Sequence, residues 1–134
     1  DKEWYITASE PDRPGGITYL PLTFEPPLRE NESLTAELDT CPTKEDLVQC
    51  YLQKEPARKL INLQNLPILI LSAEASYHAP YDHGTSNFLK QAGVEHDFIR
   101  LEDNKIHGNG HMMMLEKNNH QIADFLLEWM QSKI

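Results

Sequence analysis

The hydrophobic pattern is clearest in the second half of the chain, where apolar runs alternate with amphipathic stretches. Residues 67–71 are apolar without alternation, which is typical of a strand in a parallel sheet that is covered on both faces. Residues 85–92 have helical spacing and are followed by Gly93, a common helix terminator. Residues 97–101 form the next expected strand. The pattern predicts a strand, a helix and a second strand joined by a right-handed parallel connection.

A closing helix is predicted after residue 118. Asn118 or Asn119 is a suitable N-cap, and apolar residues then recur on one helix face at Ile122, Phe125, Leu126, Trp129 and Met130. The fold class is therefore α/β, with a βαβα unit at the carboxyl end. Two strands do not make a stable doubly wound parallel sheet alone. We expect strands from another chain or precursor fragment to complete it.

The pattern is weaker in the first half of the chain. Residues 11–27 are rich in proline and predict irregular extended chain with one strand-like piece at residues 17–24. Between residues 43 and 61 the apolar positions have helical spacing that Pro56 interrupts, which predicts two short helices. We therefore divide the chain into an irregular Pro-rich covering segment, residues 1–62, and a βαβα portion, residues 63–134.

Composition narrows the class of protein. The chain has 134 residues, a formal net charge of −9 and 40% hydrophobic residues, as ordinary globular domains do. The charge is spread along the chain without a basic stripe, which argues against nucleic acid as a partner. No apolar run reaches the roughly 18 residues that a membrane-spanning helix needs. The first residue is not Met, so we expect a processed or cleaved chain.

Two further features concern the cellular compartment. Cys41 and Cys50 lie close together in a segment rich in turn formers, and we expect them to form a local disulfide. The alternatives are that each cysteine pairs with the missing chain, or that both are free thiols in a cytosolic protein. Asn31 begins an Asn-Glu-Ser triplet, the acceptor motif for N-glycosylation. Together with the missing start residue, these features favour a secreted or extracellular glycoprotein.

The candidate chemistry centres on residues 107–119, HGNGHMMMLEKNN. His111 follows the end of an expected strand and precedes the closing helix, so its ring should reach the crevice at the carboxyl end of the sheet. The glycines around it permit an unusual backbone and close approach, and Met112 begins a run of three soft apolar side chains. We predict that His111 is a catalytic base, with an ordinary surface histidine as the alternative.

His107 and several carboxylates are further candidates for a role at this site. His107 and His111 have a spacing that superficially suggests zinc, but the intervening glycines argue against the helix such a site requires, so we expect no metal. Glu74 follows the strand at residues 67–71 and is the tentative acid that orients the imidazole. Asp82 and Glu25 are alternatives, and a solvated loop carboxylate is the plainer interpretation of each.

No serine in the chain has the setting of a nucleophile. A G-x-S-x-G motif is absent, and Ser72, Ser76 and Ser86 lack the strand-turn-helix context that exposes an attacking serine. We therefore expect the nucleophile to come from another chain.

Residues 66–129, with LPILILSAEASYHAPYDH, FLKQAGV, IHGNGHMMMLEKNN and IADFLLEW, resemble a family of α/β-hydrolase esterases found in bacteria and fungi. The upstream GITYLPLTFEPP resembles the segment that precedes this region in fungal members. The resemblance implies that His111 matches the triad histidine that deprotonates the nucleophilic serine. It also implies an acid placed earlier than usual, before Asp1 or in the Pro-rich stretch, which weakens Glu74 and keeps Glu25 open.

The resemblance further implies acyl transfer without a cofactor, although the serine, its elbow and the oxyanion loop are missing here. We therefore expect the carboxyl-terminal part of a proteolytically processed, two-chain serine hydrolase. This part would be inactive alone, and the companion chain would carry the amino-terminal half and the serine. Tyr77, His78 and Met112 would line the site for a small-molecule ester. The alternative is a noncatalytic, hydrolase-derived binding subunit.

Overall fold

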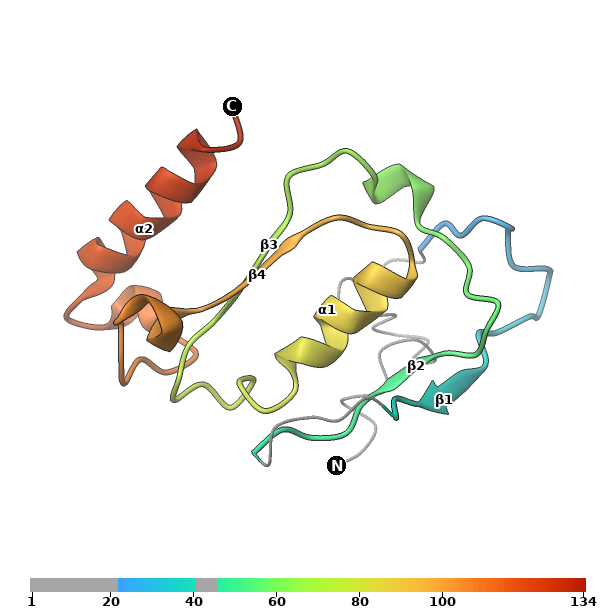
Figure 1. The fold of residues 1–134 in the computed structure, drawn as a ribbon, viewed down its shortest axis with the longest axis horizontal. Helices are drawn as coiled ribbons and strands as arrows, with labels where there is room; N and C mark the ends of the chain where they lie inside the picture. Colours follow the sequence, from blue (N-terminus) through green and yellow to red (C-terminus); the bar gives the residue numbers. More distant parts are fainter. Residues whose placement is uncertain (1–21, 41–45) are drawn as a thin grey trace.

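The computed structural model describes residues 22–40 and 46–134 of the chain. At its centre, β3 (Leu69–Ser72) and β4 (Asp97–Arg100) pair in parallel, with Leu69 opposite Asp97 and Ser72 opposite Arg100. Helix α1 (Asp82–Gln91) connects the two strands, and α2 (Asn119–Gln131) follows them (Figure 1). The predicted order of strand, helix, strand and helix is confirmed. The fold is mixed α/β, with one parallel and one antiparallel pair of strands.

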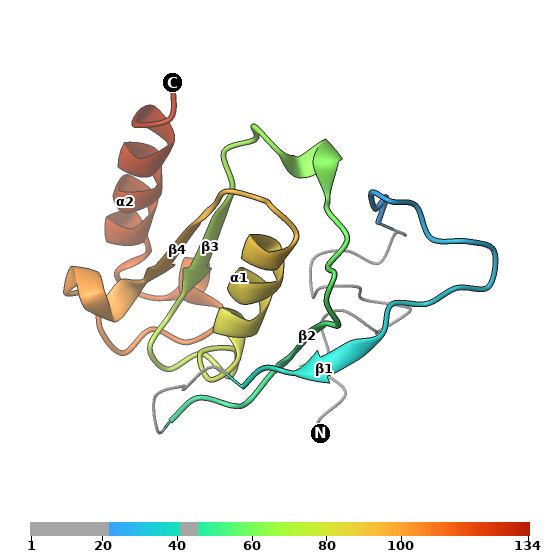
Figure 2. The ribbon, with the colours of Figure 1, turned by 45° about the vertical axis from the view of Figure 1, so that its right-hand side comes forward.

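The two helices cover opposite faces of the parallel pair (Figure 2). Ile70 packs against the buried cluster that contains Phe88 of α1, whereas Leu71 packs against the cluster that contains Ile122 of α2. Neighbouring residues of a strand point to opposite faces, so the unbroken apolar run of β3 supplies side chains to both clusters. This is the physical reason for the absence of polar alternation in that part of the sequence.

Residues before β3 pack on the side of α1 that faces away from the parallel strands. They form a short antiparallel pair, β1 (Ala36–Leu38) and β2 (Tyr51–Gln53), and an isolated bridge between Glu25 and Lys59. Buried side chains from this region complete the cluster around α1, among them Phe24 and Leu60. Single-turn 3₁₀ helices lie at Ile61–Leu63, Leu101–Asn104 and Met113–Leu115.

The two helices predicted between residues 43 and 61 are wrong for the described part of that range, which contains β2 and irregular chain. The backbone of Leu52 pairs with that of Glu37, a contact that local spacing does not encode. The Gln91 side chain reinforces the strand, because its amide accepts from Gln53 N at 2.9 Å and donates to Gln53 O at 2.8 Å. Long-range pairing therefore overrides the local helical spacing.

The boundaries of the predicted helices need smaller corrections. Helix α1 begins at Asp82, three residues earlier than expected, and the chain after it turns at Gly93 with a positive φ of 75° as predicted. Asn118 stands at the N-cap position of α2, but its side chain makes no capping hydrogen bond because it is engaged by Asn109 instead. No helix among the described residues is long and apolar enough to cross a membrane.

The disulfide expected between Cys41 and Cys50 is not formed at Cys50, which is a free thiol with 1% of its surface exposed. Cys41 lies outside the described residues. The Cys50 thiol packs directly on α1, where a Cβ on Gly84 would come within 2.5 Å of the sulfur. Cys50 is thus a core residue of the covering segment, and the absence of a side chain at Gly84 makes room for it.

Candidate functional site

The site is built from the two loops that follow β3 and β4. Consecutive residues of the first loop bind the second: the Glu74 carboxylate accepts the Gly108 N–H at 2.8 Å, and the Ala75 N–H donates to the Asn109 carbonyl at 2.9 Å. Both loops leave the carboxyl ends of parallel strands, where open α/β sheets bind ligands. These contacts bring the motif at residues 107–119 against the loop that carries the expected acid.

A buried polar network holds the second loop in shape. Only 1% of the surface of Asn109 is exposed. Its side-chain amide donates to a carboxylate oxygen of Glu116 at 2.6 Å and to the side-chain oxygen of Asn118 at 2.7 Å. The other oxygen of Glu116 accepts the Gly110 N–H at 2.7 Å. Gly108 has a φ of 76°, a conformation that residues with side chains disfavour. The unusual backbone predicted for the glycines of this motif is therefore present at Gly108.

His111 projects from this loop with its ring exposed to solvent. Its Nδ1 lies 3.2 Å from the Ser76 hydroxyl, and its ring stacks on His78 at 4.4 Å between centroids and 13° between planes. The Tyr77 ring contacts it from another direction, at 4.6 Å and 53°. Within the described ranges, Nε2 of His111 makes no hydrogen bond. The second ring nitrogen is therefore available for proton transfer.

His78 is itself held in place by α1. Its Nδ1 lies 3.2 Å from an oxygen of Asp82, the first residue of the helix, and its ring contacts Tyr81 at 4.8 Å. Asp82 was expected as a carboxylate that could orient an imidazole. It contacts the imidazole of His78 here, and no hydrogen bond joins it to His111 among the described residues.

The structure pairs the tentative acid Glu74 with His107, whose Nδ1 lies 3.2 Å from the carboxylate, and leaves it without a hydrogen bond to His111. The pKa of Glu74 lies below its ordinary value because the Gly108 N–H donates to the carboxylate and, more weakly, because His107 is beside it. Both side chains of the pair are well exposed. The backbone of Glu25 bridges to Lys59, and no hydrogen bond or ion pair joins its side chain to His111 among the described residues.

Ser76 is the site residue that sequence reasoning missed, because it was weighed only as a nucleophile. The available signal was its position in the same loop as Glu74, two residues further along. Only 6% of Ser76 is exposed, and its hydroxyl also accepts the backbone N–H of His78 at 3.1 Å. An attacking serine needs an open approach to its oxygen, so this setting favours a supporting role.

The other predicted site residues lie at the surface. Tyr77 is 62% exposed, and its ring contacts His111. Met112, which follows His111 in the chain, is 55% exposed. Asn31, the candidate glycosylation residue, is exposed in a turn. Among the described residues no group of three or more His, Cys, Asp or Glu side chains is arranged to hold a metal ion.

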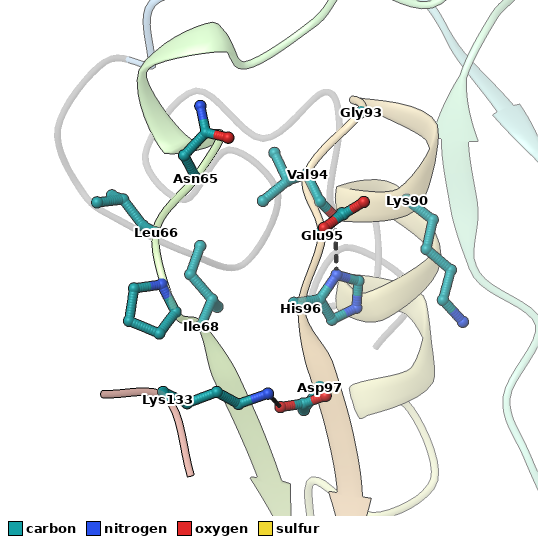
Figure 3. A pocket seen from close by; sticks show the side chains of 11 residues that line it. Asn65, Leu66, Ile68, Lys90, Gly93, Val94, Glu95, His96, Asp97 and Lys133 are labelled. Carbon is teal, nitrogen blue, oxygen red and sulfur yellow. Dashed lines mark hydrogen bonds and ion pairs between the residues drawn. The ribbon is translucent and has the colours of Figure 1, made fainter. Parts of the chain in front are cut away.

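A separate hollow of about 840 Å³ lies at the opposite, amino ends of the two strands (Figure 3). Three of its polar side chains bind groups of the protein itself. Asp97 pairs with Lys133 at 2.6 Å, and His96 has one ring nitrogen 3.0 Å from the Val94 carbonyl and the other 2.8 Å from the Ser86 hydroxyl. With both of its nitrogens occupied, His96 is a structural histidine. This hollow therefore offers no free histidine ring nitrogen, in contrast to the site around His111.

Over 124 residues the chain is 47% identical to a protein named probable secreted lipase phiG, from Fungal sp. (strain ATCC 74256). The match covers 90% of this chain and 33% of that protein, so the chain spans about a third of the length of the curated relative it matches. No protein-family model matches the chain. No solved structure matches it.

Proposed function

We propose that this chain supplies the catalytic base of a secreted serine hydrolase that cleaves carboxylic esters, with the nucleophilic serine on a companion chain. The observation that carries the proposal is the arrangement of His111. Its Nδ1 faces an oxygen of Ser76, its ring is stacked on His78, and its Nε2, at the carboxyl end of the parallel strands, has no hydrogen-bond partner within residues 22–40 and 46–134. Together these are the requirements for a general base, positioned but able to exchange a proton.

The missing half of the chemistry supports the two-part assembly. A base without a nucleophile cannot perform acyl transfer, and the sequence contains no G-x-S-x-G motif. The named lipase relative is about three times as long as the part of it that matches here. The words probable secreted lipase in its name, with the exposed Asn31 triplet, support a secreted ester hydrolase in which this chain is one part.

In the proposed mechanism, Nε2 of His111 takes the proton from the serine hydroxyl as the serine oxygen attacks the ester carbonyl. The resulting imidazolium gives the proton to the departing alkoxide, which leaves an acyl-enzyme on the serine. Water then attacks the acyl group with His111 again acting as base, and the acid is released. The exposed side chains of Tyr77 and Met112 beside His111 favour a substrate with an apolar portion.

A fluorophosphonate probe applied to the protein purified from its native source tests this proposal. The probe should label one serine on a polypeptide distinct from these 134 residues, and intact mass under denaturing conditions should show two chains. Labelling on a single longer polypeptide that contains these residues would keep the hydrolase but refute the companion chain. An absence of labelling together with absent ester turnover would instead favour a noncatalytic binding subunit.

A further inference from the structure

We infer that Ser76 positions His111 by accepting the Nδ1 proton of its ring, so that a neutral hydroxyl serves where a carboxylate was expected. This inference rests on the proposed function, because it concerns how the base is prepared. It also makes a claim about the proton on the imidazole that can be measured without any substrate.

The hydroxyl of Ser76 is built into the protein rather than free to rotate at the surface. Only 6% of Ser76 is exposed, and its backbone N–H donates to Ala73 O at 2.9 Å. The neighbouring Ala75 N–H binds the Asn109 carbonyl in the loop that carries His111. Ser76 and His111 are therefore held on two loops that are tied to each other, which fixes the 3.2 Å contact between their side chains.

The local hydrogen bonds favour the acceptor role for this oxygen. A serine hydroxyl has two lone pairs and one proton, and the backbone N–H of His78 already occupies one lone pair at 3.1 Å. The second lone pair can receive the Nδ1 proton of His111. That arrangement leaves the lone pair of Nε2 open, which is the nitrogen without a partner among the described residues. The opposite arrangement would place the ring proton on Nε2, where it would prevent proton abstraction.

The stacked ring of His78 completes the arrangement. Asp82 holds His78 at 3.2 Å, and the His78 plane lies within 13° of the His111 plane. Stacking restricts the tilt of the His111 ring, whereas the Ser76 hydroxyl restricts its rotation within the plane and selects the tautomer. Glu74 takes no part in this, because its oxygen is bound to Gly108 and His107.

The test is nitrogen-15 NMR of the histidine rings in the assembled protein at a pH where His111 is neutral. We expect the Nδ1 of His111 to show the shift of a protonated nitrogen and Nε2 that of an unprotonated one. In Ser76→Ala the signal should move toward the Nε2–H form that free imidazoles prefer, while His107 keeps its signal. An Nε2–H ring in the unmodified protein, or an unchanged tautomer in Ser76→Ala, would overturn the inference.

Kinetics provide the second readout. Ser76→Ala should lower kcat for an aryl ester by between about 10- and 100-fold with little change in KM, since the loss is one of orientation. Ser76→Thr, which keeps the hydroxyl, should recover most of the rate. Ser72→Ala is the matched control, because Ser72 is also buried and its hydroxyl has no partner among the described residues. An equal loss in both alanine variants would mean a general packing effect and refute the positioning role.

The outcomes separate this inference from the proposed function. If the assembly hydrolyses no ester but His111 carries its proton on Nδ1 in a Ser76-dependent way, the positioning contact stands and the hydrolase proposal fails. If the ester is hydrolysed and Ser76→Ala leaves the position of the His111 ring proton unchanged, the hydrolase proposal stands and this inference fails. Probe labelling of Ser76 itself would show that it is an attacking group, which contradicts the inference directly.

Discussion

The side-chain amides of Asn109 and Asn118 hydrogen-bond each other in both directions, at 2.7 Å and 2.9 Å. Asn109 is almost completely buried, and its backbone carbonyl also accepts the Ala75 N–H from the loop after β3. One residue therefore links the start of α2 to both loops of the candidate site. This link explains why an asparagine stands at position 109, between the two glycines that precede His111.

Removal of this amide should destabilise the site as well as the fold. We expect Asn109→Ala to lower the free energy of unfolding by about 2 kcal/mol, because Glu116 and Asn118 each lose a buried partner. Urea unfolding of the assembled protein measures the effect. Since the two amides satisfy each other, Asn118→Ala combined with Asn109→Ala should cost less than the sum of the single changes. Strict additivity would contradict the pairing.

The two histidines of the motif should differ sharply in their effect on ester turnover. His111→Ala should reduce kcat/KM of the assembly by several orders of magnitude, because the proposed base is needed both to form and to hydrolyse the acyl-enzyme. His107→Ala should have a much smaller effect, through the loss of its contact with Glu74 at the edge of the loop. Initial rates with an aryl ester measure both variants. Similar rates for His111→Ala and the unmodified protein would remove the central assignment.

Cys50 should react slowly with thiol reagents in the folded protein. Burial, and to a lesser degree the charge of Asp39, raises the pKa of the Cys50 thiol to about 11. Because the folded pKa is raised, the neutral thiol contributes stability below the ordinary value of 9.0, and that contribution is lost as pH rises toward 11. Alkylation at pH 8, followed residue by residue with peptide mapping, should modify Cys50 only after denaturation.

The same mapping decides the cysteine pairing. Recovery of Cys50 as a free thiol would agree with the structure. A disulfide-linked peptide that contains both Cys41 and Cys50 would contradict the assignment of Cys50 as a free thiol. Rapid alkylation of Cys50 in the folded protein would likewise contradict its burial.

Acid should loosen the end of α2 from β4. Hydrogen bonds from Lys133 and Trp129, in that order, hold the pKa of Asp97 below its ordinary value. The carboxylate therefore contributes stability above the unfolded pKa of about 4, and this contribution is lost as pH falls through the lower folded pKa. The pair is partly exposed, so the effect should not exceed about 1 kcal/mol.

The indole N–H signal of Trp129 in NMR spectra reports this contact, because it donates to Asp97 at 2.6 Å. We expect the signal to shift during acid titration, and Asp97→Asn should weaken the pH dependence. Lys105→Gln is the control, since that exposed lysine lies away from the pair in the chain. If neither acid nor Asp97→Asn changes the Trp129 indole signal, the hydrogen bond between Trp129 and Asp97 is ruled out.

The sequence by itself determined the order of β3, α1, β4 and α2. An unbroken apolar run and two amphipathic stretches have few ways to bury their side chains, so local periodicity was enough. It also placed His111 at the carboxyl end of the strands, because the motif lies in the loop that follows β4. By contrast, local spacing failed between residues 43 and 61, where Leu52 pairs with Glu37 from a distant part of the chain.

Only the tertiary structure decided which group faces Nδ1 of His111. Glu74 and Ser76 are two residues apart in one loop, and either was within reach of the motif by sequence. The Ala75 N–H bonds to the Asn109 carbonyl, and this single contact sets the register of the two loops. In that register Glu74 meets Gly108 and His107, and Ser76 meets His111. Whether Glu74 or Ser76 faces His111 depends on how two segments that are distant in the sequence pack together, and no local sequence pattern contains that information.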